Sequence, residues 1–412
     1  MQAVLGIGFL LLVLWLISES RSSVQWRPVA VGLSMQFLLA FLFLGVPAVS
    51  ESLMFANKIV YAIERATVAG TGFVFGYLGG GGAPFEVSVE GALYVFAFRV
   101  LPQILLFSVL VAVLWYWRIL PMIVNGFGLL LRRALGVGGA VGTAAAASVF
   151  LGMVESPLVI RAYLQQVSRS EFFTVMTCGM ATVAGSIMVL YANVLLDVIP
   201  GALGHILAAS VLNVVGAVVL SRIFIPSQDD TDDDQAQQSL RYSSNMDAIT
   251  RGTADGLRLA VNVGAMLVVL VSLVALVNQG LGLVSIAEAP LTLERLMGWI
   301  FAPMAWLIGI PWVEAQAAGA LLGSKLILNE LVAFLELAAL TDTQLSSGSR
   351  LIMMYTLCGF ANFGSLGIML GGLTTLVPER RSEILSIGPK ALIAGTIVNL
   401  NTGAIVALVS LY

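Results

Sequence analysis

Long apolar stretches recur along the whole chain, and they constrain its fold more than any other feature. A helix that crosses a bilayer needs about 20 mostly apolar residues. Stretches of this kind occupy residues 3–18, 28–49, 91–117, 171–196, 202–224, 257–280, 347–372 and 386–411. Charged residues make up only 10% of the 412, against about 25% in soluble proteins, which excludes a water-soluble enzyme. The sequence therefore predicts an all-α polytopic membrane protein with eight transmembrane helices.

The chain has few cysteine and histidine residues, which excludes several kinds of functional site. The only cysteines, Cys178 and Cys358, lie in apolar segments, and His205 is the only histidine. These counts exclude a disulfide framework, a zinc cluster and a histidine-based catalytic site. The net charge is −3, and the excess of acid comes from the aspartates of residues 229–234. We therefore expect neither an enzyme nor a nucleic-acid partner.

The distribution of basic residues orients the spans, because cytoplasmic loops are enriched in Lys and Arg. With the N-terminus outside, the inner loops contain Arg21, Arg27, Arg118, Arg132, Arg133, Arg169, Arg222, Arg241, Arg251, Arg258, Arg380, Arg381 and Lys390. The outer side then keeps mainly Lys58, Arg65, Arg295 and Arg350. We expect both termini to lie outside.

Two further apolar stretches, 138–168 and 312–342, do not read as plain spans. The first is interrupted at Glu155, two residues before Pro157, and the second at Asn329-Glu330. Proline is tolerated in the first turn of a helix and breaks an interior one. We therefore expect two re-entrant helical hairpins, whose turns survive at membrane depth only inside protein or along a wet cavity.

The hairpins belong to an internal repeat. Each is followed by a span with a small-residue break, at 182–187 after the first and at 360–365 after the second, and then by a plain span. The predicted orientation makes the hairpins enter from opposite sides, so the repeat is inverted. Paired broken segments in the two halves indicate the binding site of a transporter.

The repeat divides the chain into five expected parts. They are scaffold spans and interfacial helices in 1–137, the first hairpin repeat of a transport domain in 138–225, an acidic cytoplasmic linker in 226–256, a scaffold span with an interfacial helix in 257–311, and the second hairpin repeat in 312–412. Within the first part, the stretches 51–78 and 118–135 have the amphipathic pattern of interfacial helices.

Several motifs resemble those of the concentrative nucleoside transporter family, bacterial type, along nearly the whole chain. They are Phe96-Ala97-Phe98-Arg99-Val100-Leu101-Pro102-Gln103-Ile104, Met246-Asp247-Ala248-Ile249, Asp255-Gly256-Leu257, Gly323-Ser324-Lys325, Asn329-Glu330 and Phe360-Ala361-Asn362-Phe363. The resemblance implies eight spans, two opposed hairpins, a homotrimer and a nucleoside site between the hairpin tips and the broken spans. It also implies the inner membrane of a bacterium.

The resemblance assigns the substrate-binding residues. On the ribose side it implies Glu330, Phe360, Asn362 and Ser365, whose carboxylate, amide and hydroxyl suit sugar hydroxyls while the ring covers an apolar face. On the base side it implies Gly152, Met153, Val154, Glu155 and Ile187. Here the sequence departs from the family, because Gly-Met-Val-Glu-Ser-Pro replaces Gly-Gln-Thr-Glu or Gly-Gln-Ser-Glu before the proline. The preferred base stays open.

The resemblance also implies a Na⁺ site made of oxygen atoms, from the Ser148 and Thr182 hydroxyls and the Leu151 and Val183 carbonyls. Hard cations prefer such ligands. Sodium-coupled members usually carry Asn at position 148, so H⁺ carried by Glu155 or Glu330 is the alternative, since burial favours the neutral form of a carboxyl. No other cofactor is expected.

The leading hypothesis is a symporter that imports nucleosides by alternating access, coupled to Na⁺ or H⁺. One alternative is a proton-coupled importer of a modified nucleoside or related base–sugar compound. Another is a nucleoside-gated receptor or channel, since related hairpins occur in gate modules.

Overall fold

The computed structural model describes residues 1–46, 62–63, 65–87, 93, 95–161, 163–196, 198–226, 241–286 and 289–410. Within these ranges the chain is helical apart from short turns and a two-residue antiparallel ribbon of β1 (Ser285–Ile286) and β2 (Ala289–Pro290). The predicted all-α class is confirmed. The acidic run at 229–234 and the stretch 51–61 of the expected interfacial helix lie outside the described residues.

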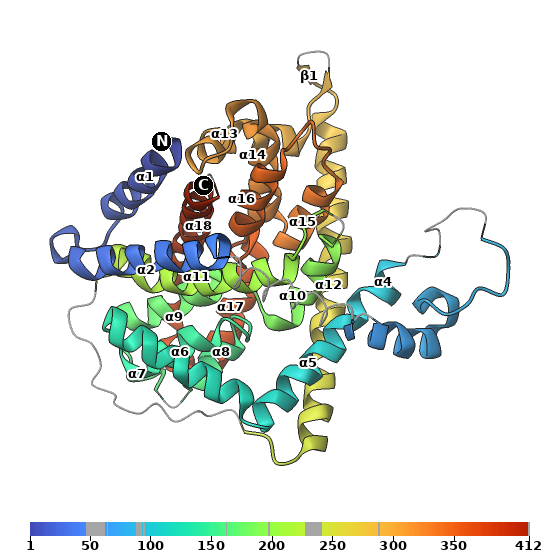
Figure 1. Ribbon diagram of the computed structural model, residues 1–412, viewed down its shortest axis with the longest axis horizontal. Helices are drawn as coiled ribbons and strands as arrows, with labels where there is room; N and C mark the ends of the chain where they lie inside the picture. The colour runs from blue at the N-terminus through green and yellow to red at the C-terminus, as the bar shows by residue number, and fades with distance from the viewer. Residues whose placement is uncertain are drawn as a thin grey trace.

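The helices before the first hairpin follow the predicted apolar and amphipathic stretches. They are α1 (Gln2–Leu16), η1 (Arg21–Ser23), α2 (Trp26–Gly45), η2 (Gly76–Gly79), α4 (Phe96–Arg99), α5 (Leu101–Tyr116) and α6 (Ile119–Leu135). Figure 1 shows α4 and the helical segment near η2 at the end of the molecule farthest from α1.

The segments that we assign to the two predicted repeats contain two series of five helices in the same order. The first contains α7 (Gly139–Ala147), α8 (Glu155–Val159), α9 (Arg169–Ala181), α10 (Gly185–Val194) and α11 (Ala202–Phe224). The second contains α14 (Trp312–Ile327), α15 (Glu330–Ala339), α16 (Ser347–Leu357), α17 (Phe363–Leu376) and α18 (Arg381–Val409), with η3 (Pro378–Arg380) before the last helix. In each series two helices joined by a turn come first, and a helix with a break and a long helix follow. That each joined pair is a re-entrant hairpin stays a prediction, and the term hairpin is used for these pairs below.

Between the repeats lie α12 (Asn245–Leu281) and α13 (Leu293–Leu307). Figure 1 shows α12 running along one flank of the molecule beside α5. A Cβ on Gly252 or Gly256 would lie under 3 Å from the α5 backbone, at Val109 and Leu105. The Gly-x-x-x-Gly spacing therefore lets these two helices approach closely, as small residues do between membrane helices.

The breaks in the helices are built by specific caps. Ser168 and Glu171 form a capping box at the start of α9. The Asn329 side chain accepts from the Val332 N–H at 2.9 Å to start α15, and the Asn362 side chain accepts from the Ser365 N–H at 2.7 Å to start α17. The polar residues that interrupt the apolar pattern are thus the residues that begin the next helix.

The second helix of the chain is fastened to both repeats by a buried glutamine. Gln36 donates from Nε2 to the Leu212 carbonyl of α11 at 3.0 Å and to the Thr402 hydroxyl of α18 at 3.1 Å. Its Oε1 accepts from Asn401 at 3.0 Å. Because Gln36 is fully buried, these bonds satisfy a polar group that would otherwise destabilise the packing.

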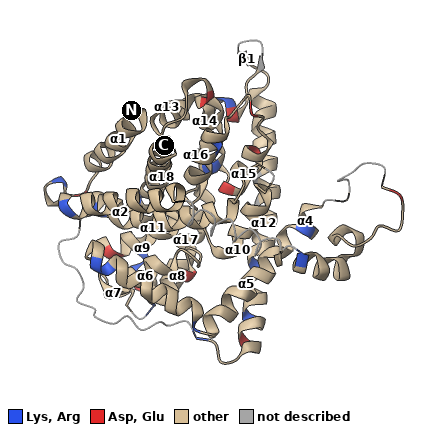
Figure 2. Cartoon of the chain, viewed as in Figure 1, with Lys and Arg blue, Asp and Glu red and all other residues tan. Residues whose placement is uncertain are grey.

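Within the described ranges, six helices are long and apolar enough to cross a membrane by length and composition. They are α2, α4 with α5, α9 with α10, α11, α12 and η3 with α18. The pair α13 and α14 also passes this test but is bent by 117°. Each of the eight predicted stretches is occupied by a helix or a helix pair, and Figure 2 shows long uncharged segments along them. The number of crossings stays a prediction.

An ionic cluster joins the loop after α1 to both repeats. Glu19 accepts from Arg169, the first residue of α9, at 2.8 Å and from Lys390 of α18 at 2.6 Å. The hydrogen bond from Arg169 lowers the pKa of Glu19 from 4.5 to about 2, with partial burial opposing it and Lys390 adding to it. All three residues belong to the predicted cytoplasmic side.

Replacing Glu19 by Gln is expected to destabilise the protein by at most about 1 kcal/mol at neutral pH, because the side chain is partly exposed to solvent. The folded-state pKa of about 2 lies below 4.5, so the stabilisation is complete above that value and is lost as the pH falls toward 2. Unfolding temperatures of wild type and Glu19→Gln, measured in detergent from pH 7 downward, should converge below about pH 4.5. The exposed Glu86→Gln is the control, and a gap that persists unchanged at pH 3 would contradict the assignment.

Candidate functional site

The two broken helices, α9 with α10 and α16 with α17, meet at their breaks in the centre of the protein. This meeting point is called the crossing below. The Phe360 N–H, after the end of α16, donates to the Thr182 carbonyl at the end of α9 over 3.0 Å. Asn399 of α18 donates from Nδ2 to the carbonyls of Ala181 at 2.8 Å and Cys358 at 3.2 Å. Helix ends leave carbonyls without partners. Here the Phe360 N–H and the Asn399 amide donate to the carbonyls at the ends of α9 and α16.

A buried carboxylate lies next to this crossing. Glu330 is the first residue of α15 and is 5% exposed. Its Oε1 accepts from the Tyr191 hydroxyl at 2.5 Å, and its Oε2 accepts from the Asn362 amide at 2.8 Å. The second hairpin, the first broken helix and the second broken helix thus each contribute one member of a hydrogen-bonded triad.

Tyr191 is a member of the site that the sequence analysis did not name. It lies one turn after Ile187 in α10, is 1% exposed, and packs its ring at 4.9 Å from that of Phe334. A tyrosine four residues after a predicted site residue in the same helix was the available signal, because i and i+4 share a helix face.

The other residues predicted for the ribose side also lie at the second break. Phe360 and Ser365 are 6% and 7% exposed, and Asn362 is 1% exposed. Phe363, the first residue of α17, is 59% exposed and points away from this buried group. The geometry therefore brings Glu330, Asn362 and Ser365 together, with Asn362 bonded to both of the others.

The tip of the first hairpin docks on the first break. The Phe150 carbonyl accepts from the Gly185 N–H at 2.9 Å, and a Cβ on Gly185 would lie 2.7 Å from that carbonyl. Only a glycine allows the tip this close to the start of α10. The predicted base-side residues are therefore held near the crossing by the hairpin backbone.

Those base-side residues have different surroundings from one another. A Cβ on Gly179 of α9 would lie 3.0 Å from the Met153 Cβ, and one on Gly372 of α17 would lie 2.7 Å from Val154. Met153 and Val154 therefore pack against helix backbones. Glu155 begins α8 with its side chain exposed and folded back toward Gly152, whereas Glu330 is buried.

The predicted cation ligands lie between the first hairpin tip and the end of α9. Ser148 and Thr182 are buried, and their hydroxyls donate to the Ala145 carbonyl at 2.7 Å and to the Cys178 carbonyl at 2.9 Å. A hydroxyl that donates its hydrogen keeps its lone pairs for a cation. Leu151 and Val183 lie in the non-helical segments after α7 and α9, where carbonyls fall outside the helical ladder. This donor set fits Na⁺.

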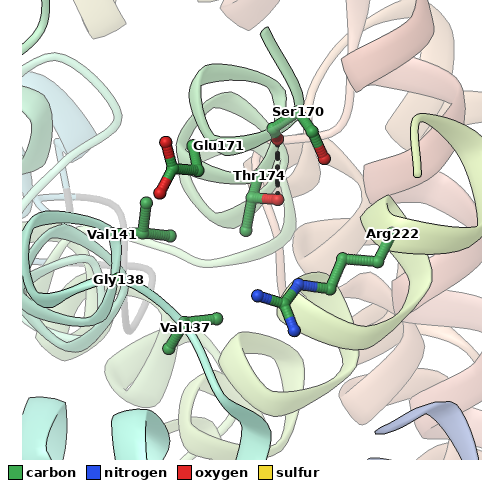
Figure 3. Close-up of a pocket in the computed structure, with 7 residues that line it drawn as sticks. All are labelled: Val137, Gly138, Val141, Ser170, Glu171, Thr174 and Arg222. Atoms are coloured by element: carbon green, nitrogen blue, oxygen red, sulfur yellow. Dashed lines mark hydrogen bonds between the residues drawn. The ribbon is translucent and has the colours of Figure 1, made fainter. Parts of the chain in front are cut away.

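A pocket elsewhere in the protein does not involve these residues. Figure 3 shows it between α7, α9 and α11, lined by Val137, Gly138, Val141, Ser170, Glu171, Thr174 and Arg222. Ser170 and Thr174 there bond to the Ile225 carbonyl and to the Ser221 hydroxyl. Its polar groups thus serve helix packing at the base of the first hairpin, and the candidate site is the crossing.

Comparison with known families identifies related proteins over most of the chain. The model for the C-terminus of Na⁺ dependent nucleoside transporters matches residues 205–407, and the model for their N-terminus matches residues 5–78. A third model, described as nucleoside recognition, matches residues 97–196. The last match contains the first hairpin and the first broken helix.

Individual relatives align over the full length. An uncharacterised transporter of Haemophilus influenzae is 36% identical over 417 residues, with 99% of this chain and 97% of the relative covered. The nucleoside permease NupC of Helicobacter pylori is 35% identical over 414 residues, with 98% and 97% covered. The structure of CNTnw in an inward-facing substrate-bound state has a TM-score of 0.90 at 35% identity, with 99% of this chain and 98% of that chain covered.

Because the chain segments approach closely at the crossing, adding one methyl group at Gly359 should lower the stability of the protein. A Cβ on Gly359 would lie 2.4 Å from Asn399 Oδ1 and 2.5 Å from the Ala181 carbonyl. Gly359→Ala should therefore destabilise the protein by about 2 kcal/mol or more, measured as a lower unfolding temperature in detergent. Gly367→Ala in α17 is the matched control, because a Cβ there meets nothing within 4 Å. Equal stability of the two variants would contradict the crossing geometry.

Proposed function

The chain belongs to the Na⁺-dependent nucleoside transporter family, and from this premise we propose that it is a secondary active symporter that imports nucleosides across the inner membrane. Like its relatives, the protein is a transporter and not an enzyme. The observation that carries the proposal is the buried triad of Tyr191, Glu330 and Asn362, which joins the second hairpin to both broken helices.

The triad suits a ribose because it offers both acceptors and donors on three buried side chains. Both oxygens of Glu330 accept hydrogen bonds within the protein. Sugar hydroxyls can donate to the same oxygens and accept from the Asn362 amide, so binding exchanges internal bonds for bonds to the substrate. Hydrogen bonds to a charged group are worth about 1.5–3 kcal/mol each, which is enough to select a polyhydroxylated ligand. Phe360 and Ser365 complete this side of the proposed site, and Ile187 belongs to the base side.

The base lies, in this proposal, toward the first hairpin tip at Gly152, Met153, Val154 and Glu155. Met153 and Val154 pack on helix backbones and bring no hydrogen-bonding group. A base edge left without partners loses about 1–3 kcal/mol for each buried group. Glu155 is the polar side chain available there, so selection among bases depends on it.

The proposed coupling ion is Na⁺, held by Ser148, Leu151, Thr182 and Val183. Its support is the buried set of hydroxyls and non-helical carbonyls after the ends of α7 and α9. H⁺ coupling is the second candidate, supported by Ser148, which stands where sodium-coupled members usually carry Asn. In that case a glutamate carries the proton, and the substrate class extends to modified nucleosides.

Alternating access, in this proposal, moves the hairpin repeats 138–225 and 312–412 against a scaffold drawn from 1–137 and 257–311, with the linker 226–256 on the cytoplasmic face. A homotrimer with both termini outside completes the proposed arrangement. A nucleoside-gated receptor or channel is distinguished by flux that does not accumulate substrate against a gradient.

Uptake of labelled uridine and adenosine into proteoliposomes tests the function and the ion together. We expect an imposed Na⁺ gradient to drive accumulation of at least one nucleoside, and an imposed proton gradient alone to do so weakly. Proton-driven accumulation would replace Na⁺ by H⁺ in the proposal. Equilibration without accumulation would favour the channel, and absence of uptake under both gradients would contradict import of these nucleosides.

Variants of the triad test the ribose site. Glu330→Gln should abolish uptake in proteoliposomes, because the neutral amide replaces an acceptor with a donor. Tyr191→Phe removes the hydroxyl and keeps the ring on Phe334, so it should raise KM about 10-fold or more, the equivalent of about 1.4 kcal/mol, with a smaller change in kcat. The control Tyr163→Phe alters a tyrosine that is not part of the triad. Wild-type KM in Tyr191→Phe would exclude this residue from recognition.

A further inference from the structure

The recognition of a nucleoside leaves one buried charge unexplained, the ammonium group of Lys325. Lys325 lies in the last turn of α14 and is 4% exposed. Its Nζ donates to the Thr356 carbonyl at 2.8 Å and to Asn399 Oδ1 at 2.7 Å. Burying an ammonium group costs several kcal/mol unless its surroundings compensate, and the two oxygen acceptors at Nζ supply such compensation.

One of the two acceptors, the Thr356 carbonyl, is free to accept because α16 ends at Leu357. In a continuous helix the Thr356 carbonyl would accept from the N–H of residue 360, but the Phe360 N–H donates instead to the Thr182 carbonyl of the other break. The Thr356 carbonyl is thus released at the negative end of the α16 dipole. Lys325 takes the place of the missing N–H.

The repeat gives this arrangement a counterpart in the first half of the chain. The predicted cation site lies between the end of α7, at Ser148, and the end of α9, at Thr182. The corresponding helix ends in the second repeat are those of α14 and α16. Lys325 joins them, because it lies in the last turn of α14 and donates to the Thr356 carbonyl of α16. In both repeats, the C-terminal end of the first half of the broken helix, α9 or α16, is therefore a place where a cation would be stabilised.

We propose that the Lys325 ammonium is a tethered cation, which occupies in the second repeat the place that the free coupling cation takes in the first. As a positioning residue it holds α14, the end of α16 and α18 together and attracts the Glu330 carboxylate across the hairpin tip. Because the charge is covalently attached, the second repeat needs no ion from solution. The correspondence to a coupling ion rests on the proposed function, whereas the cation site at Lys325 itself does not.

Chemical rescue of Lys325→Ala tests the site without any transport measurement. In choline chloride, whose cation is too large to enter, the unfolding temperature of purified Lys325→Ala should fall by about 5 °C or more relative to wild type. Methylammonium chloride at equal ionic strength should restore most of that loss, because methylammonium can bind the Thr356 carbonyl and Asn399 Oδ1. Wild type should not respond to methylammonium.

Three further variants separate the charge from packing and from hydrogen bonding. Lys325→Arg should keep the stability, whereas Lys325→Met fills the space without charge and should be unstable and not rescued. Lys325→Gln keeps a donor, so wild-type stability of this variant would overturn the proposal by showing that the charge is dispensable. Lys390→Ala, which removes a lysine from the exposed Glu19 cluster, is the control and should not respond to methylammonium. Failure of methylammonium to stabilise Lys325→Ala would equally overturn it, whatever the uptake assays give.

Uptake then connects the site to coupling. If wild type accumulates nucleoside with a Hill coefficient of about 1 for its cation, Lys325→Ala should show either a coefficient near 2 or a half-saturating cation concentration raised 10-fold or more. An unchanged cation dependence in an active Lys325→Ala would limit Lys325 to stability and contradict its correspondence to the coupling ion.

Discussion

The crossing of two interrupted helices is the constraint on which the rest of this structure depends. Each interruption releases carbonyl groups where water is scarce, and a released carbonyl must find another donor. Asn399 and Asn213 supply amides to the Ala181 and Cys358 carbonyls, and the Phe360 N–H and Lys325 supply the remaining donors. These donors and carbonyls form a cluster of buried polar groups at the crossing, and we propose that a polar ligand binds there.

Glu330 shows how a site for sugar hydroxyls can exist in such surroundings. An unpaired carboxylate at membrane depth is expensive, but here both oxygens are hydrogen-bonded from two different broken helices. The hydroxyls of a ribose can replace these partners group for group. In the proposed mechanism, Glu330 is therefore hydrogen-bonded both with and without substrate. Only its partners change, from Tyr191 and Asn362 to the hydroxyls of the ribose.

The sequence predicts the repeats and part of the site because both rest on local signals. Asn-Glu after an apolar stretch and Phe-Ala-Asn-Phe within one interrupt the pattern, and the structure has helix starts at Asn329 and Asn362. Tyr191 and Asn399 lie inside helices that continue past them, so no break in the apolar pattern marks them. Their importance comes from partners 139 and 218 residues away, Glu330 and Ala181. Such pairings depend on how helices cross, which no local pattern specifies.

The two repeats are alike in order but differ in what they hold, and the difference follows from hairpin length. In the first hairpin seven residues separate α7 from α8, from 148 to 154, whereas only Leu328 and Asn329 separate α14 from α15. The long tip exposes Glu155 and offers backbone carbonyls, which suits a ligand or ion that comes and goes. The short tip places Asn329 and Glu330 directly after the helix that carries Lys325, and both charged side chains are hydrogen-bonded within the protein. If the two halves are the inverted repeats that the sequence predicts, this difference in tip length agrees with the proposal that only the first half takes its cation from solution.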